Sequence, residues 1–172
     1  MGWNCFRRVV VPVSAPERLS VDVAGLKIVF EPDAMAAFDK HRQNSRWRRE
    51  AGGQLFARIR GSRWEIKAAT GPKNRDRRGR YMFMPDRSSE QEEIYQFHSR
   101  GLEYVGDWHT HPQDEPEPSE SDLTSIARIV ASSQHHLPGF LLVIVGRREF
   151  PSGLWVSFHS VGGPLLPASP RF

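Results

Sequence analysis

Two histidines separated by one residue, His109 and His111, form the first pattern in the chain that is capable of metal chemistry. On an extended strand, residues i and i+2 point to the same side, so the two imidazoles can bind one ion. The pair is weak evidence by itself, because seven histidines in 172 residues give about 0.3 such pairs by chance. A metal site therefore needs a further ligand.

Asp122 offers that ligand, near the beginning of a predicted helix that starts at Ser119. Pro112 ends the strand, and the loop that follows is long enough to bring the first turn of the helix back over the histidines. Two imidazoles and one carboxylate leave a fourth tetrahedral position for water, as in catalytic zinc sites. Zinc lowers the pKa of that water towards about 7 and polarises a bound carbonyl group.

Ser119 and Asp122 also have a purely structural interpretation. They occupy the N-cap and N3 positions of a capping box, and serine and aspartate are common where helices begin. The two interpretations are compatible with each other. Because the histidine pair precedes the helix, we favour a ligand role for Asp122.

A zinc hydrolase also needs a base, which removes a proton from the water and later returns it to the leaving amine. The candidate is Glu50, in the segment Glu-Ala-Gly-Gly-Gln-Leu (50–55). The alternative is a surface acid at the end of an arginine-rich helix, because exposed glutamates are common.

The neighbours of the histidines on their strand divide between its two faces. Asp107 shares the histidine face, where it either orients a ligand or pairs with an arginine. Trp108 and Thr110 face the other way, so we expect them in the core. We assign no role to the other five histidines, which lack partners at ligand spacing.

Hydrophobic periodicity predicts the elements that position these residues. Residues 140–145 are apolar without alternation, which is typical of a central strand covered on both faces. The fold class is therefore α/β, with a mixed central sheet flanked by helices. We expect strands at 26–31, 55–60, 64–69, 81–84, 103–111, 140–145 and 153–159, and helices at 31–48, 89–101 and 119–131, with hairpin or loop turns at 52–53, 61–62 and 71–80.

Length and composition set the wider frame. A chain of 172 residues, 38% hydrophobic and 26% charged, suits a single soluble domain, 1–172, with a core at about 20–162 and a flexible Pro-rich C-terminal tail. Cys5 is the only cysteine, which excludes an intrachain disulfide and a thiolate zinc cage and fits a reducing cytoplasm. We interpret Met1 to Val13 as a strand or tail rather than a signal peptide, and no apolar run approaches the ~20 residues of a membrane span.

Charge is concentrated in three places. Basic clusters at 42–49 and 73–80 could meet nucleic acid or an acidic protein surface, but no recognition motif accompanies them, so we favour solvated arginines and expect no nucleic-acid partner. The acidic loop 113–118 either selects a basic substrate or stays solvated, and we favour the latter. Loop 71–80 could also border a groove in which an extended substrate tail adds as a strand.

Taken together, the motifs resemble the JAMM signature of the JAB/MPN zinc metallopeptidases. The matching segments are Glu-x-Gly-Gly-x-Leu (50–55), Val-Gly-Asp-Trp-His-Thr-His-Pro (105–112) and Ser-x-x-Asp (119–122), and the order of elements is similar from about 25 to 160. The resemblance implies αβα layers related to those of cytidine deaminases. It also implies one Zn²⁺ with a catalytic water, bound by His109, His111 and Asp122, with Glu50 as general acid/base and Ser119 as hydroxyl donor to the oxyanion.

The resemblance further implies an isopeptidase or peptidase that cleaves after a ubiquitin-like modifier or a similarly conjugated protein. The small bacterial proteins of antiphage (CBASS-type) operons, which deconjugate a cGAS-like nucleotidyltransferase, are the most similar in character. Two alternatives stay open: a catalytically silent scaffold that binds a ubiquitin-like partner, and a processing peptidase for a sulfur-carrier or ubiquitin-like precursor. A nucleobase deaminase is excluded because it needs a Cys-x-x-Cys pair, and a zincin because His-Glu-x-x-His is absent. The oligomeric state is left open.

Overall fold

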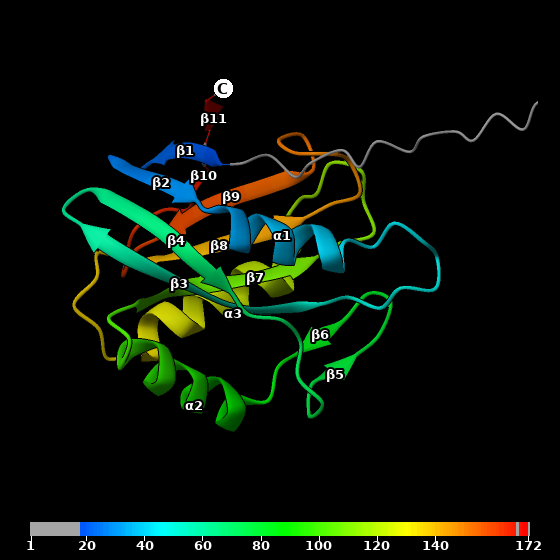
Figure 1. Ribbon diagram of the computed structural model, residues 1–172, viewed down its shortest axis with the longest axis horizontal. Helices are drawn as coiled ribbons and strands as arrows, with labels where there is room; N and C mark the ends of the chain where they lie inside the picture. The colour runs from blue at the N-terminus through cyan, green and yellow to red at the C-terminus, as the bar shows by residue number, and fades with distance from the viewer. Residues whose placement is uncertain (1–17, 168, 172) are drawn as a thin grey trace, which may run out of the picture.

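A mixed β-sheet forms the centre of the molecule in the computed structural model (Figure 1), which describes residues 18–167 and 169–171. Within these residues, nine strands pair in the order β10-β9-β8-β7-β3-β4-β2-β1-β11. The pairs β2·β4 and β7·β8 are parallel and the others are antiparallel. The predicted mixed sheet is thereby confirmed, whereas Cys5 and the predicted element at 1–13 lie outside the described residues.

The sheet and a small hairpin contain eleven strands among the described residues, and three helices accompany them. The helices are α1 (Pro32–His41), α2 (Arg87–His98) and α3 (Glu120–Ser132). The strands are β1 (Leu19–Val23), β2 (Leu26–Phe30), β3 (Gly52–Arg60), β4 (Arg63–Ala69), β5 (Arg77–Arg78), β6 (Phe83–Met84), β7 (Glu103–Thr110), β8 (Phe140–Val145), β9 (Leu154–His159), β10 (Leu166–Pro167) and β11 (Ser169–Arg171), of which β5 and β6 form the separate hairpin.

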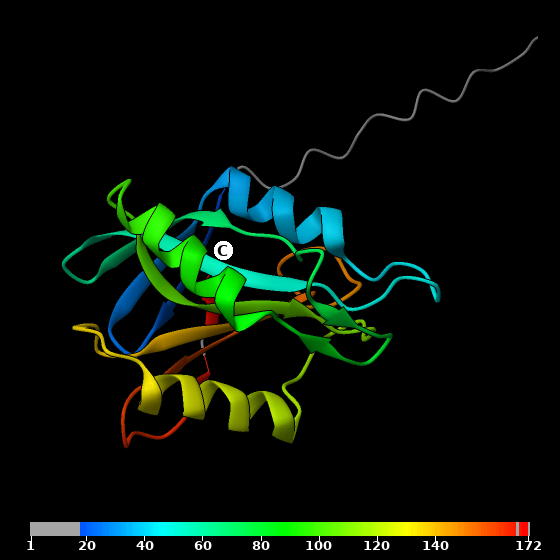
Figure 2. The same ribbon diagram turned by 90° about the horizontal axis from the view of Figure 1, so that it is seen from below.

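Helices cover both faces of the sheet, and Figure 2 shows α1 and α3 on opposite sides of it. On one face, Phe38 of α1 packs its ring 5.0 Å from that of Trp108. On the other face, Phe97 of α2 stacks on Phe56 with centroids 4.0 Å apart, and Ile126 and Val130 of α3 join a separate apolar cluster with residues of β8. The layers are therefore αβα, and β8 is buried along its whole length, as its apolar run predicts.

The predicted end of the first helix is wrong, because the helix ends at His41 and not near Arg48. The backbone leaves the helix at Arg42, with φ −49° and ψ 135°. Gln43 follows and is 1% exposed, and its side-chain amide donates to the carbonyl oxygens of Arg48 and Arg80 at 3.1 Å each. These hydrogen bonds, of which the one to Arg80 is long-range, help to fold residues 42–51 into a loop, which local periodicity does not reveal.

Other boundaries also differ from the predicted ones. Gly52, expected in a break, begins β3. The strand passes so close to β7 here that a Cβ would lie 2.6 Å from the carbonyl oxygen of Trp108, which accounts for a glycine at this strand position. Asp86, not Ser89, caps α2, and its side chain accepts from the backbone N–H of Ser89 at 3.0 Å. The segment 71–80 contains β5, and the Pro-rich segment expected as a frayed tail adds β10 and β11 to the sheet. No helix in the described part of the chain is long and apolar enough to cross a bilayer.

Candidate metal and active site

The two histidines of the His-x-His pattern lie side by side at the end of β7. His109 is in the strand, and His111 continues the pairing because its N–H donates to the carbonyl oxygen of Val145 at 2.9 Å. The extended backbone therefore projects both imidazoles to one side, with their Nε2 atoms 3.1 Å apart. Trp108 and Thr110 face the opposite side and are 1% and 0% exposed, as predicted.

Asp122 meets this pair from the first turn of α3. Its Oδ1 lies 3.2 Å from Nε2 of His109, and its Oδ2 lies 3.3 Å from Nε2 of His111. Ser119 forms the predicted capping box, because its hydroxyl accepts from the N–H of Asp122 and its own N–H donates to Asp122 Oδ2 at 2.7 Å. The cap and the contact with the histidines thus coexist.

The spacing of these donor atoms fits a small divalent metal ion. One atom from each of His109, His111 and Asp122 can be chosen so that all lie within 4.8 Å of one another. Zinc–ligand bonds of about 2.0–2.1 Å in a tetrahedron separate neighbouring ligand atoms by about 3.3 Å, close to the 3.1 Å between the two Nε2 atoms and to the 3.2 and 3.3 Å between each imidazole and the nearer oxygen of Asp122. Two imidazole nitrogens and a carboxylate oxygen also form a donor set that suits zinc.

Asp122 has the protonation state that such a site needs. Burial raises its pKa, but hydrogen bonds from His109 and His111 outweigh burial and hold the pKa well below the ordinary value of an aspartate. Asp122 is therefore ionised at neutral pH and available as an anionic ligand.

Glu50 lies in the same cleft and is only 5% exposed. Its position in the fold excludes the alternative of a surface acid at a helix end. Its pKa is raised to about 7: burial is the largest cause and raises it, His111 lowers it, and Asp122 raises it. A carboxyl group with a pKa near 7 can both accept and release a proton at neutral pH, which is what a general acid/base requires.

The backbone of Glu50 is held by the hairpin β5–β6 and its flanking residues. Its N–H donates to the carbonyl oxygen of Gly79 at 2.7 Å, and Arg78 Nε donates to the carbonyl oxygen of Glu50 at 2.6 Å. Both the N–H and the carbonyl group of Glu50 are therefore hydrogen-bonded, which fixes the segment before β3.

Thr110 joins the strand of the histidines to the segment of Glu50. Its hydroxyl oxygen accepts from the N–H of Ala51 at 3.0 Å, and its hydroxyl donates to Oε1 of Gln43 at 3.0 Å. The N–H of Thr110 also donates to the carbonyl oxygen of Ala51 at 2.8 Å. Gln43 gives no sequence signal, because a glutamine in an arginine-rich segment reads as a surface residue.

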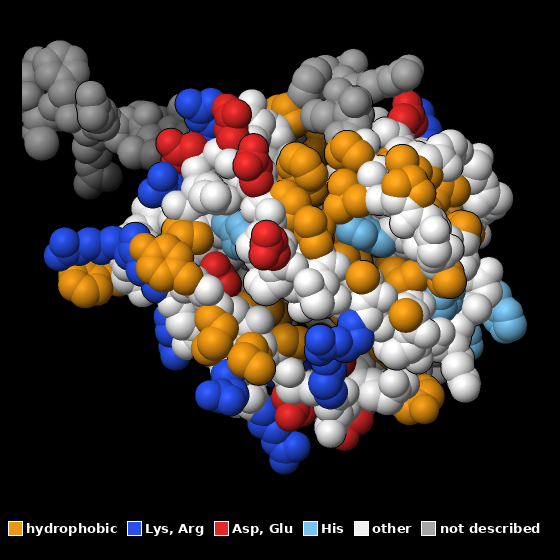
Figure 3. All heavy atoms as spheres, turned by 180° about the vertical axis from the view of Figure 1, so that it is seen from behind, with side chains coloured by type: hydrophobic (Ala, Val, Ile, Leu, Met, Phe, Trp, Pro, Cys, Tyr) orange, Lys and Arg blue, Asp and Glu red, His pale blue; other side chains and the backbone are white. Residues whose placement is uncertain are grey.

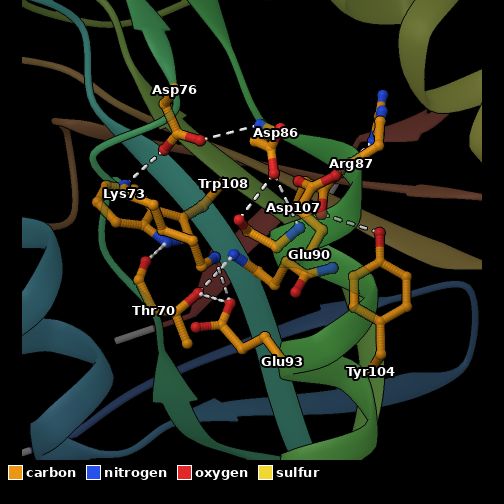
Figure 4. Close-up of polar contacts among 12 residues, drawn as sticks. Thr70, Lys73, Asp76, Asp86, Arg87, Glu90, Glu93, Tyr104, Asp107 and Trp108 are labelled. Atoms are coloured by element: carbon orange, nitrogen blue, oxygen red, sulfur yellow. Dashed lines mark hydrogen bonds and ion pairs between the residues drawn. The ribbon is translucent and has the colours of Figure 1, made fainter.

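Asp107, on the histidine face of β7, takes part in a polar cluster with α2 (Figure 4). Its carboxylate accepts from the hydroxyl of Tyr104 at 2.8 Å, beside the ion pair of Arg87 and Glu90 at 2.8 Å. Burial raises the pKa of Asp107, and burial together with Asp107 raises that of Glu90 to about 7. The hydrogen bond of Asp107 is thus to a tyrosine rather than to an arginine.

A cleft of about 670 Å³ contains all five residues that the sequence singles out. No other histidine of the described residues lines it. Its walls are partly apolar and come from β6, the segment before β6, and α3. Besides Glu50, His109, His111, Ser119 and Asp122, the residues that line the cleft include Tyr81, Met82, Phe83, Met84, Ile126 and Ile129.

The acidic loop beside the cleft is largely neutralised by the chain itself. Asp114 pairs with Arg147 at 2.9 Å, and Glu115 pairs with Arg148. This pairing agrees with the preference for a loop that does not select a basic substrate.

Comparison with known proteins agrees with this geometry. A family model described as prokaryotic homologs of the JAB domain matches residues 32–158. The chain belongs to this family. The match covers α1 to β9 and therefore includes every residue of the cleft described above.

Three named relatives are similar to this chain, two of them over more than two thirds of its length. A CD-NTase/cGAS isopeptidase of Pseudomonas aeruginosa is 36% identical over 121 residues, which are 69% of this chain and 76% of the relative. One of Escherichia coli is 27% identical over 144 residues, 81% of this chain and 86% of the relative. A probable metalloprotease of Sinorhizobium fredii is 38% identical over 72 residues, 40% of this chain and 44% of the relative. These names support a hydrolase of the JAB type.

A solved structure supports the fold alone. The solution structure of a protein from Desulfitobacterium hafniense superposes with a TM-score of 0.51 at 19% identity, covering 78% of this chain and 82% of that one. The roles of the individual site residues stay predictions.

The hydrogen bonds of Thr110 predict the effect of removing its hydroxyl. In Thr110→Val, the N–H of Ala51 loses one partner and Gln43 Oε1 is left buried without a donor. We expect the free energy of unfolding to fall by about 1–3 kcal/mol. Urea denaturation measures this, with Thr110→Ser as the control that keeps the hydroxyl. Equal stability of the valine and serine variants would contradict the assigned network.

The raised pKa of Glu50 predicts a pH-dependent stability in protein freed of metal. The folded state keeps the proton up to about pH 7, whereas the unfolded state loses it near 4.5, the ordinary pKa of a glutamate. The contribution of Glu50 to stability is therefore complete below about 4.5 and is lost as the pH rises towards 7. We expect wild type to lose stability relative to Glu50→Gln across this window, measured by urea denaturation. Parallel profiles of the two proteins would show that the pKa is not raised.

Proposed function

We propose that the protein is a zinc-dependent isopeptidase or peptidase of the JAB type. The observation that carries the proposal is the meeting of three ligand atoms with the buried carboxyl group of Glu50 in one cleft. A silent scaffold has no need of a buried carboxyl group with a pKa of about 7 beside such a cluster. This arrangement favours catalysis over the scaffold alternative.

In the proposed mechanism, His109, His111 and Asp122 would hold one Zn²⁺ ion, which would supply Lewis-acid polarisation of the scissile carbonyl group and of the attacking water. Glu50 accepts the proton of that water as it attacks the carbonyl carbon. Glu50 then delivers the proton to the amine nitrogen as the carbon–nitrogen bond breaks. The pKa of about 7 suits both transfers.

Ser119 is the proposed donor to the oxyanion that develops on the carbonyl oxygen. Its hydroxyl donates to Asp122 Oδ2 at 2.6 Å and lies 2.8 Å from Ser121 Oγ. Ser119 therefore has to rotate its hydroxyl towards the substrate to act in this way, while its backbone N–H keeps the contact with Asp122.

The proposed substrate is a protein conjugated through its C-terminus, as a cGAS-like nucleotidyltransferase or a ubiquitin-like modifier would be, in the cytoplasm of a bacterium defending itself against phage. The names of the Pseudomonas aeruginosa and Escherichia coli relatives support this class. A processing peptidase for a sulfur-carrier or ubiquitin-like precursor is the second candidate, since it would use the same cleft and the same residues. Phe83 and Met84 of β6 line the cleft, which supports docking of an extended tail beside the hairpin.

The proposal predicts the behaviour of Glu50→Gln. The variant should bind one equivalent of zinc, because the ligands are unchanged, but its cleavage rate should fall by at least about 100-fold, because the amide cannot transfer the proton. Metal analysis and cleavage of fusions that join candidate ubiquitin-like or nucleotidyltransferase C-termini to a reporter provide the two measurements.

The matched control is Glu117→Gln, which removes an exposed acid of the loop beside the cleft. It should cleave like wild type, and a chelator should inactivate both proteins. Cleavage by Glu50→Gln at the wild-type rate would contradict the role of Glu50. Partner binding without cleavage by wild-type protein loaded with zinc would favour the scaffold.

A further inference from the structure

Exposed aromatic residues and arginines form one surface beside Glu50. We call this the Arg–aromatic surface, and it comprises Arg46, Trp47, Arg49, Arg77, Arg80 and Tyr81. Trp47 is 78% exposed and Tyr81 is 72% exposed. Figure 3 shows basic side chains interspersed with hydrophobic ones along this side of the molecule. Large aromatic side chains left this open to water, and gathered in one place, are typical of a binding surface.

The surface joins two segments that are distant in sequence. Gln43, in the first segment, donates to the carbonyl oxygen of Arg80 in the second at 3.1 Å, and the guanidinium group of Arg80 donates to the carbonyl oxygen of Arg46. A guanidinium group also lies over each aromatic ring: Cζ of Arg46 is 4.4 Å from the ring centroid of Trp47, and Cζ of Arg80 is 5.3 Å from that of Tyr81. The two segments are therefore fastened together and their rings are held in place before any partner binds.

The positive charge of the surface is not compensated within the chain. Among the described residues, Arg46, Arg49, Arg77 and Arg80 form no ion pair. Arg78, which donates to the carbonyl oxygen of Glu50, forms none among these residues either. Elsewhere around the cleft, Lys73 pairs with Glu93, Arg87 with Glu90, Arg147 with Asp114 and Arg148 with Glu115. Positive charge without a partner is thus concentrated on the Glu50 side of the cleft, which is complementary to an acidic partner.

The surface is continuous with the cleft. Tyr81 belongs to both, and Met82 and Met84, which are 41% and 48% exposed, extend the apolar lining outwards. Arginine, tryptophan, tyrosine and methionine are the residues most enriched at the centres of protein–protein interfaces. We propose that the Arg–aromatic surface binds an acidic segment of the conjugated protein, with an apolar or aromatic residue placed among its carboxylates; this rests on the proposed function. A protein partner is favoured over nucleic acid because the surface is continuous with the cleft through Tyr81, so a protein substrate cut in the cleft would extend onto it.

Fluorescence anisotropy with labelled peptides tests the proposal. The first probe is a fluorescein-labelled peptide of about 14 residues, rich in Asp and Glu with one Phe; its length is set by the reach of roughly 3.3 Å per extended residue. The second probe is its counterpart with Asn and Gln in place of the acids. Full-length protein should bind the acidic peptide at least about tenfold more tightly than the amide peptide, and the preference should weaken at high salt.

Three variants locate the binding. Arg46→Glu and Trp47→Ala should each weaken binding of the acidic peptide by about tenfold, because their side chains contact each other and otherwise face solvent. Arg60→Glu, an equal charge change at the exposed end of β3, should alter it by less than about twofold. Circular dichroism confirms that each variant is folded. Equal loss in all three variants, or no preference for the acidic peptide, would overturn the proposal.

Two further measurements distinguish binding of the acidic peptide from cleavage and from nucleic-acid binding. Glu50→Gln should bind the acidic peptide like wild type, because binding to the surface does not require cleavage. Failure of peptide binding and failure of cleavage can therefore be told apart. A labelled single-stranded oligonucleotide of similar length should bind more weakly than the acidic peptide. Tighter binding of the oligonucleotide, lost in Arg46→Glu and Trp47→Ala, would assign the surface to nucleic acid and overturn the proposal.

Discussion

The contact between Asp122 and the two imidazoles is the interaction on which the arrangement of the cleft depends. It joins the first turn of α3 to the end of β7, two elements separated by a loop with no regular structure. The capping box with Ser119 fixes the carboxylate at the helix end, and the packing of Ile126 and Val130 against the sheet fixes the helix itself. One carboxylate therefore couples the position of a whole helix to the geometry of three ligand atoms.

Glu50 is the second constrained group, and its surroundings explain why its segment is so heavily hydrogen-bonded. A buried carboxyl group is unfavourable when ionised, and the nearby Asp122 adds to that cost, so the pKa rises to about 7. The chain holds Glu50 there through Gly79 and Arg78 on one side and through Ala51 and Thr110 on the other. The same loops that fix the carboxyl group also present the Arg–aromatic surface, so the positioning of Glu50 and the proposed docking of the substrate share one scaffold.

Much of this arrangement could be predicted from the sequence, because it follows from local rules. The period of two in β7 places His109 and His111 together, the apolar run of β8 marks a central strand, and the helix start at Ser119 has a recognisable cap. Loop 42–51 could not be predicted, since it is shaped by the distant partners of Gln43. The burial of Glu50 and the joining of segments 42–49 and 77–81 likewise arise from tertiary contacts, which a pattern of residue types does not contain.

We propose that His109, His111 and Asp122 bind one zinc ion in an open site. Anomalous diffraction at the zinc edge, from crystals grown with one equivalent of zinc, tests this binding. We expect a single strong peak about 2.0–2.1 Å from Nε2 of both histidines and from one carboxylate oxygen of Asp122, with a non-protein fourth ligand. A peak bound by other residues, or no peak in the cleft, would contradict it.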